Sequence, residues 1–158
     1  MTTTTITINN HRDLDALVAE HVMGWRWWTA KVWVAGYGKD GTDSSFLLPT
    51  DIDDHPVDLV KPKLCVGDCP KPFSDWQDYI PHYSTKISSA WQVVTAMEET
   101  HHWQLETLSD SDAPYWVGIT AHGGSGFKPD HYSLALTMPE AICLVALAAK
   151  GVGVKKKE

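Results

Sequence analysis

This sequence of 158 residues has few cysteines, no long apolar run and no signal peptide, the features by which secreted and membrane proteins are recognised. Three cysteines are too few, and odd in number, for a disulfide framework, which favours a reducing compartment. No apolar run reaches the roughly 18 residues of a membrane span. The first residues, MTTTTITINN, lack the basic and apolar regions of a signal peptide. We therefore expect a cytoplasmic protein that does not associate with membranes.

Positive charge is also scarce, since the formal net charge is -7. The basic run Lys155–Lys157 is short and terminal, and we expect it to be frayed. A general DNA- or RNA-binding protein normally shows a basic patch. The composition therefore argues against general nucleic-acid binding.

Catalytic motifs are missing as well. EETHHW is not the H-E-x-x-H of a metalloprotease, and we expect His101 and His102 to lie at a solvated helix end. HGGSGFK lacks the G-K-[ST] of a P-loop, and no G-x-S-x-G elbow is present. No pair of carboxylates is placed together by periodicity for acid–base chemistry. We expect no catalytic residue, no enzyme activity and no cofactor.

Metal binding has one weak candidate. Cys65 and Cys69 form a C-x3-C pair that His55 or His82 would have to complete as a zinc site. A single cysteine pair without a second at finger spacing is a weak signal. The alternative, two free cysteines on a loop, is the interpretation we adopt, so no metal site is predicted.

The first half of the chain predicts a helix and a hairpin after a Thr-rich stretch over residues 1–10, for which an extended lead-in and a short edge strand are the two interpretations. Apolar residues at helical spacing predict a helix that Asp13 caps and Gly24 ends. Alternating apolar residues predict a strand over residues 27–36, and SSFLLP (44–49) is its hairpin partner.

The second half predicts a helix, a hairpin and a last helix. Ser84 or Thr85 caps the first helix, whose expected buried stripe is Ile87, Ala90, Trp91, Val94 and Met97. Strands are predicted over 115–122 and 131–137. The last helix opens on the capping box of Thr137 and Glu140, is apolar nearly all round and ends at Gly151.

The predicted order is thus α-β-β-α-β-β-α. Two hairpins imply a largely antiparallel sheet with helices packed on it, an α+β fold. The length suits a single domain over residues 1–158. Residues 49–81, rich in proline and aspartate, are interpreted as an excursion within that domain.

Three stretches carry a family resemblance. AEHVMGWRWW (19–28), PHYSTKISSAWQVVTAME (81–98) and MPEAICLVALAAKGV (138–152) resemble the phage ABA sandwich domain family in sequence and in order. The resemblance implies a bacteriophage origin, hence the cytoplasm of the infected bacterial host, and an α/β/α sandwich with the sheet between helices. The chain departs from the family at Lys86, where an acidic residue is common, and at residues 49–81. The resemblance implies no activity.

Candidate binding residues come from aromatic clusters and a helix N-terminus. Trp27, Lys31 and Trp33 lie on the same face of one predicted strand. Trp116 shares a face of a later strand with Gly118 and His122. Aromatic rings and a lysine suit a planar, anionic ligand, since base stacking contributes about 1–3 kcal/mol per base. Ser84 and Thr85 precede a helix, where free N–H groups favour anions. The alternatives are tryptophans packed under a helix and ordinary N-caps.

Two functional hypotheses follow. The first is a phage-encoded, non-enzymatic binding protein, a homo-oligomer that sequesters a nucleotide-like ligand such as a host immune signal. The second is a protein-interaction module or minor structural phage protein that binds a host or phage protein. A cyclic-nucleotide hydrolase is a third hypothesis, which would need a metal or base that the sequence does not place.

Overall fold

The computed structural model describes residues 4–32, 42–48, 80–109, 111–124 and 128–157. The chain divides into two compact units, one of residues 1–23 and 81–158 and one of residues 24–80. The elements follow one another as β1 (Thr4–Ile8), α1 (His11–His21), β2 (Arg26–Val32), β3 (Thr42–Leu48), α4 (Ile87–Met97), β4 (His101–Thr107), β5 (Tyr115–Ala121), β6 (His131–Ala135), α5 (Met138–Ala149) and β7 (Val152–Lys156).

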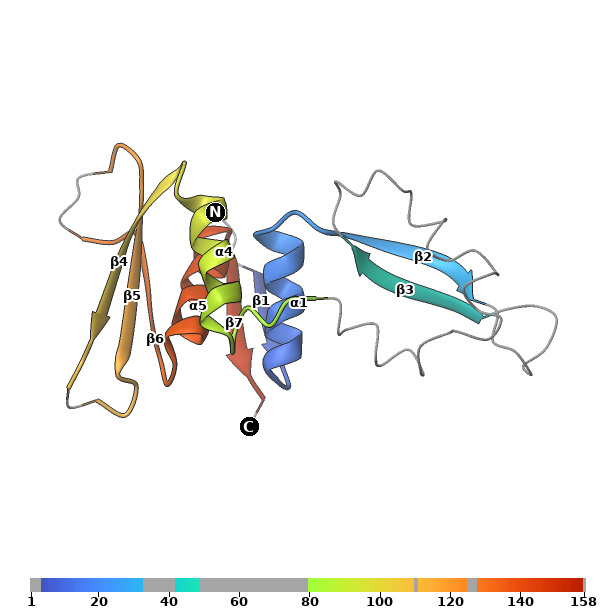
Figure 1. Cartoon of the computed structure of the whole chain (residues 1–158), viewed down its shortest axis with the longest axis horizontal. Coiled ribbons are helices and arrows are strands. Elements are labelled where there is room, and N and C mark those ends of the chain that lie inside the picture. Colours follow the sequence, from blue (N-terminus) through green and yellow to red (C-terminus); the bar gives the residue numbers. More distant parts are fainter. Residues whose placement is uncertain (1–3, 33–41, 49–79, 110, 125–127, 158) are drawn as a thin grey trace. The chain divides into compact units, whose positions relative to one another are not determined.

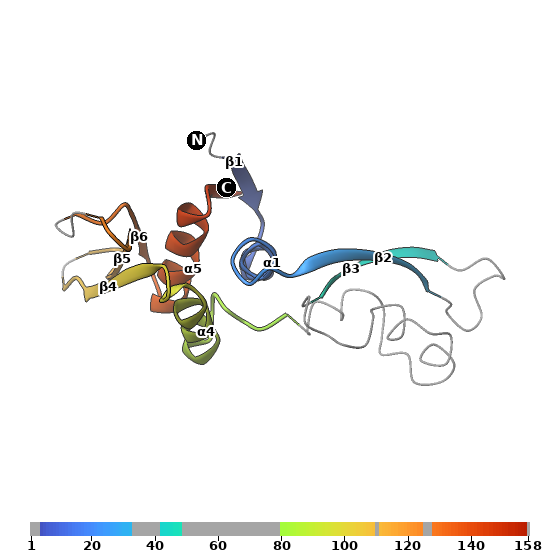
Figure 2. The same cartoon turned by 90° about the horizontal axis from the view of Figure 1, so that it is seen from above.

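Helix α5 is the centre of the first unit. It packs against β5, β6 and β7 as well as α1 and α4 (Figures 1 and 2). Because the helix is apolar nearly all round, it can be enclosed in this way, and Ile142, Val145 and Leu147 are fully buried. The Thr137 side chain accepts a hydrogen bond from the Glu140 N–H at 3.4 Å, and Gly151 follows the helix with a φ of +79°. The predicted buried helix and its two ends are confirmed.

Strands β4, β5 and β6 form an antiparallel sheet in that order. The predicted hairpin of β5 and β6 is confirmed, with Gly118 paired with Tyr132. Strand β4 was not predicted: His101 lies in this strand and not at a helix end. Trp103 and Leu105 alternate there with Gln104 and Glu106, the two-residue period of a half-buried strand.

The chain ends pair with each other as β1 and β7, which run parallel. The expectation of a frayed terminal lysine run is wrong, because Lys155 pairs with Thr7 and Lys156 with Ile8. Lys156 also forms an ion pair with Glu140, which is almost fully buried at the start of α5. The strand therefore ties the C-terminal segment to the core helix.

The N-terminal end of α1 differs from the prediction. Asn10 is the N-cap, and its side chain accepts a hydrogen bond from the Asp13 N–H at 3.0 Å. Asp13 lies one turn further on, where its carboxylate accepts a 2.7 Å hydrogen bond from the Asn9 N–H. The Asn10 side chain thus satisfies one N–H group that a helix start leaves free, and the Asp13 carboxylate fixes the residue before the cap. Gly24, with a φ of +75°, follows the helix as expected.

Helix α4 differs from the prediction in its cap and in its buried face. Its N-cap is Lys86 in an extended conformation, without a side-chain hydrogen bond, so neither Ser84 nor Thr85 caps it. Ile87 and Trp91 are 53% and 51% exposed. The buried stripe contains Ala90, Val93, Val94 and Met97. The stripe is displaced toward Val93 because α5 covers that side of the helix.

The second unit contains the antiparallel hairpin of β2 and β3, as predicted. Its strands pair from Arg26 with Leu48 to Val32 with Thr42. The rest of the expected strand over 27–36 and residues 49–79 of the Pro- and Asp-rich excursion, with Cys65 and Cys69, lie outside the described residues.

The mixed α+β class is confirmed for the described residues. They form three helices, a parallel pair of strands, a separate hairpin and a three-stranded antiparallel sheet. The described strands therefore form separate sheets, and the expected single sheet packed between helices is not observed. The predicted order lacks β1 and β7, which are five residues long and lie near the ends of the chain, and β4, which directly follows α4.

Candidate ligand-binding face

The sheet of β4, β5 and β6 has one covered and one open face. Val117 and Ile119 lie on the face toward α5 and are fully buried. In Figures 1 and 2, α4 and α5 lie on this side, and no helix of the first unit's described part lies on the other. The other side of the sheet is the outer sheet face. Alternate residues of the three strands lie on it, and the strand register places them next to one another: His102, Gln104, Glu106, Trp116, Gly118, Thr120, Tyr132 and Leu134.

Two aromatic rings lie together on the outer sheet face. The Trp116 and Tyr132 ring centroids are 6.4 Å apart with 21° between the ring planes. Tyr132 is 65% exposed. A Cβ atom at Gly118 would lie 2.6 Å from the Trp116 Cη2 atom and 3.0 Å from the Pro129 Cβ atom. Glycine at this position therefore allows the indole to lie close to the strand, and the two rings offer similar orientations to a planar ligand.

Two imidazoles lie further along the same face. The ring centroids of His102 and His122 are 4.2 Å apart, and both residues are exposed. His102 is the register partner of Thr120, and Trp116 is that of Glu106. The outer sheet face thus has a carboxylate beside its aromatic rings. Its imidazoles, which can donate hydrogen bonds, lie about four residues along the strand from those rings, or roughly 13 Å.

His101 lies on the covered face of the same strand. Burial lowers its pKa, and the nearby Lys150 and His122 add to this effect. The Thr100 Oγ1 and His101 Nδ1 atoms are 2.8 Å apart. His101 therefore disfavours its charged form, which makes it a poor partner for an anion.

Ser84 and Thr85, predicted as contacts at a helix N-terminus, have different environments. Ser84 is fully buried: its N–H donates to Asp15 Oδ1 at 2.7 Å and its hydroxyl donates to the His11 carbonyl at 3.2 Å. Thr85 is exposed and precedes the Lys86 cap. The hydroxyl and N–H of Ser84 thus hold the segment before α4 against α1.

The remaining predicted contacts belong to the second unit. In β2, Trp27 pairs with Leu47 and Lys31 with Asp43, whereas Trp33 lies outside the described residues. Trp116 belongs to the first unit. The candidate site is therefore built on Trp116 and its neighbours within the first unit.

Three residues of the outer sheet face were missed from the sequence: Tyr132, His102 and Glu106. Pairing the predicted hairpin in register places Tyr132 opposite Gly118, so this neighbour of Trp116 was within reach. His102 and Glu106 were missed because β4 was not recognised. Its two-residue alternation was the available signal.

Substitution of Gly118 by alanine tests the aromatic arrangement. The new methyl group would overlap the Trp116 ring, so we expect the indole to turn away from the strand, with net destabilisation of about 1 kcal/mol. Near-ultraviolet circular dichroism and tryptophan emission should both change. The same substitution in a Trp116→Phe background should leave the tryptophan signals unchanged. Equal changes in the two backgrounds would contradict this placement of the ring.

The described part of the chain contains no group of three His, Cys, Asp or Glu residues with the geometry of a metal site. None of its helices is long and apolar enough to cross a membrane.

Comparison with known proteins agrees with a small mixed α+β domain. The phage ABA sandwich domain model matches residues 16–147, so the chain belongs to the phage ABA sandwich domain family. A crystal structure of a phage protein from Bacillus cereus ATCC 14579 is similar, with a TM-score of 0.53 and 22% identity over 94% of each chain. At this identity, the similarity supports the fold alone. No curated protein matches the sequence.

Proposed function

We propose that this phage ABA sandwich protein is a non-enzymatic binding protein whose outer sheet face captures a small, nucleotide-like ligand, such as a host immune signal. The observation that carries the proposal is the pair of near-parallel rings of Trp116 and Tyr132 beside Gly118, of which the Tyr132 ring is mostly exposed. Stacking on exposed aromatic rings is the common way for proteins to hold a base without base-pairing.

The chemistry along the outer sheet face supports this ligand class. A base on the Trp116 and Tyr132 rings has the Glu106 carboxylate nearby as an acceptor for its amino groups. The phosphate lies toward His102 and His122, whose ring N–H groups donate hydrogen bonds. These local hydrogen-bond donors matter because the net charge of the whole chain is -7, which repels an anion.

A thermal-shift screen tests the proposal. The panel contains mononucleotides, cyclic dinucleotides, cyclic trinucleotides and ADP-ribose derivatives. A ligand at about 100 times its dissociation constant stabilises by roughly 2.7 kcal/mol, which raises the melting temperature by about 5–10 °C. A selective rise with the ligand recovered intact after heating supports sequestration. Recovery of an altered ligand indicates an enzyme, such as a hydrolase, and a flat panel contradicts the proposal.

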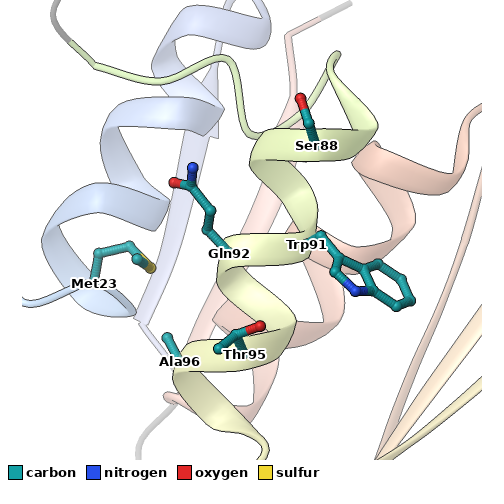
Figure 3. Close-up of a pocket in the computed structure, with 6 residues that line it drawn as sticks. All are labelled: Met23, Ser88, Trp91, Gln92, Thr95 and Ala96. Atoms are coloured by element: carbon teal, nitrogen blue, oxygen red, sulfur yellow. The ribbon is translucent and has the colours of Figure 1, made fainter.

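Replacing Trp116 by alanine should weaken binding of the ligand found in that screen about tenfold, since one stacking contact contributes about 1–3 kcal/mol. Isothermal titration calorimetry measures the change. Trp91→Ala is the matched control, because this tryptophan is accessible to solvent but lies on α4 (Figure 3). Equal losses in both variants would place the ligand elsewhere.

A protein-binding role is the second candidate function. It is favoured by exposed apolar residues beside the aromatic pair: Leu134 is 45% exposed and Leu136 is 65% exposed. Exposed apolar clusters of this kind mark interaction surfaces. Loss of a host-protein partner in pull-down on Leu134→Asp substitution, together with a flat nucleotide panel, would favour this role.

A further inference from the structure

Two exposed imidazoles lie against each other at one end of the outer sheet face. His102 belongs to β4, and His122 directly follows β5. Their ring centroids are 4.2 Å apart and the ring planes are tilted by 37°, so the rings are close neighbours without stacking face to face. The neutral imidazole is the commonest metal ligand among protein side chains, and two of them on adjacent strands can bind one ion together.

Backbone pairing holds the two histidines in a fixed diagonal arrangement. His102 pairs with Thr120 in the strand register, and the His122 N–H donates a hydrogen bond to the Thr100 carbonyl at 2.9 Å. The pairing of β4 with β5 thus continues through His122, which lies two residues beyond the partner of His102. Diagonal neighbours on one face of an antiparallel pair are close enough for long side chains to meet. Ligands on paired strands are held more precisely than ligands on a loop.

The spacing of the two rings selects among metal ions. An ion about 2.1 Å from a ring nitrogen lies about 3.2 Å from the centroid of that ring. Two centroids 4.2 Å apart therefore subtend an angle of about 80° at an ion that both rings bind. Neighbouring ligands of a square-planar or octahedral ion are about 90° apart, whereas those of a tetrahedral ion are about 109° apart. The spacing favours Cu²⁺ or Ni²⁺ over a tetrahedral Zn²⁺.

We infer that His102 and His122 together bind one divalent transition-metal ion, Cu²⁺ or Ni²⁺, through one nitrogen of each ring. No group of three ligand residues occurs in the described part of the chain, so water completes the coordination and the site is weaker than one with three or four protein ligands. The second nitrogen of each ring remains an N–H donor. This inference does not depend on the proposed nucleotide-like ligand, because the imidazoles bind the ion without it.

Titration of Ni²⁺ into the full-length protein without an affinity tag, followed by isothermal titration calorimetry, tests the site. His102→Ala and His122→Ala should each weaken Ni²⁺ binding about 100-fold or more, because two linked ligands become one. Both residues are exposed, so neither substitution should unfold the protein. His131→Ala is the matched control. This exposed histidine of β6 pairs with Ile119 of the covered face, and its removal should leave the affinity unchanged.

Electron paramagnetic resonance of the protein with one equivalent of Cu²⁺ identifies the ligands directly. The wild-type spectrum should show coupling to two imidazole nitrogens, and this pattern should be lost in either alanine variant. A wild-type protein that binds no Ni²⁺ at millimolar concentration, or equal affinity in His102→Ala, His122→Ala and His131→Ala, overturns the inference. Trp116→Ala should leave Ni²⁺ binding unchanged while it weakens the nucleotide-like ligand, so the two proposals can fail separately.

Discussion

Replacing Asp15 by alanine is expected to destabilise the protein by about 3 kcal/mol, the lower end of the cost of breaking a buried ion pair. Asp15 is fully buried in α1. Its carboxylate accepts hydrogen bonds of 2.7 Å from both Arg12 Nη1 and the Ser84 N–H. We expect a cost at the lower end of that range because the Arg12 side chain, which loses its partner, is 21% exposed and can be hydrated.

The effect should spread beyond α1, because Asp15 joins two segments that are distant in sequence. Without the carboxylate, the buried Ser84 N–H loses its acceptor, and an unsatisfied buried donor costs roughly 1–3 kcal/mol. Ser84 precedes α4, so the start of that helix should loosen with it. Thermal unfolding should show a melting temperature lower by roughly 10–20 °C for a unit of this size.

Two further variants separate charge from hydrogen bonding. Asp15→Asn retains an acceptor for the Ser84 N–H but removes the charge opposite Arg12, so we expect about half of the alanine effect. Asp112→Ala removes an exposed carboxylate and should change stability by less than about 0.5 kcal/mol. An Asp15→Ala protein as stable as the Asp112→Ala protein would contradict this assignment.

Elements with strong periodicity could be predicted from the sequence. The enclosed helix α5, the hairpin of β5 and β6 and the hairpin of β2 and β3 were found because their patterns are locally determined. A helix that is covered on all sides needs an apolar residue at nearly every position, and the sequence of α5 has this property. Turn glycines and the Thr137 cap then define where such elements begin and end.

The strands β1 and β7 could not be predicted with the same logic. They pair in parallel across almost the full length of the chain, and each is only five residues long. Each strand alternates over only two apolar residues, Ile6 and Ile8 in β1 and Val152 and Val154 in β7, and tertiary packing decides that they pair with each other. Lys156 is held because Glu140, buried at the start of α5, needs a counter-ion.

The candidate site was predicted in part for a similar reason. Trp116 was selected from its neighbours Gly118 and His122 on one strand. Its neighbour Tyr132 comes from another strand and depends on the hairpin register. The choice of Ser84 illustrates the opposite case. A hydroxyl before a helix suggests a cap or an anion site, but only the tertiary structure shows that Asp15 and His11 occupy its donors.

Raising the pH above 10 is expected to destabilise the protein through Tyr83. This residue is 1% exposed, and burial raises its pKa from 10.0 to about 12, with smaller contributions from Asp15 and Cys143. In the unfolded chain the phenol ionises near its ordinary pKa. The unfolded state therefore releases a proton first between pH 10 and pH 12, so the free energy of unfolding falls as the pH rises. The stability is fully present below pH 10.

The loss attributable to Tyr83 should be about 1.4 kcal/mol at pH 11 and approach roughly 2.7 kcal/mol above pH 12, which corresponds to two pKa units. Urea unfolding from pH 9 to pH 12, compared with Tyr83→Phe, measures it by difference. The comparison is needed because burial also raises the pKa of the Cys143 thiol, which acts in the same direction in both proteins.

Tyr132→Phe provides the control, because this ring is 65% exposed and loses little hydration on folding. It should follow the wild-type pH dependence, whereas Tyr83→Phe should show a shallower one. If all three proteins lose stability equally between pH 10 and pH 12, the alkaline sensitivity comes from other groups. A selective effect at Tyr83 would instead show that the segment between Pro81 and α4 stays packed against α1, with Asp15 beside the phenol, because only a solvent-excluded ring resists ionisation in this way.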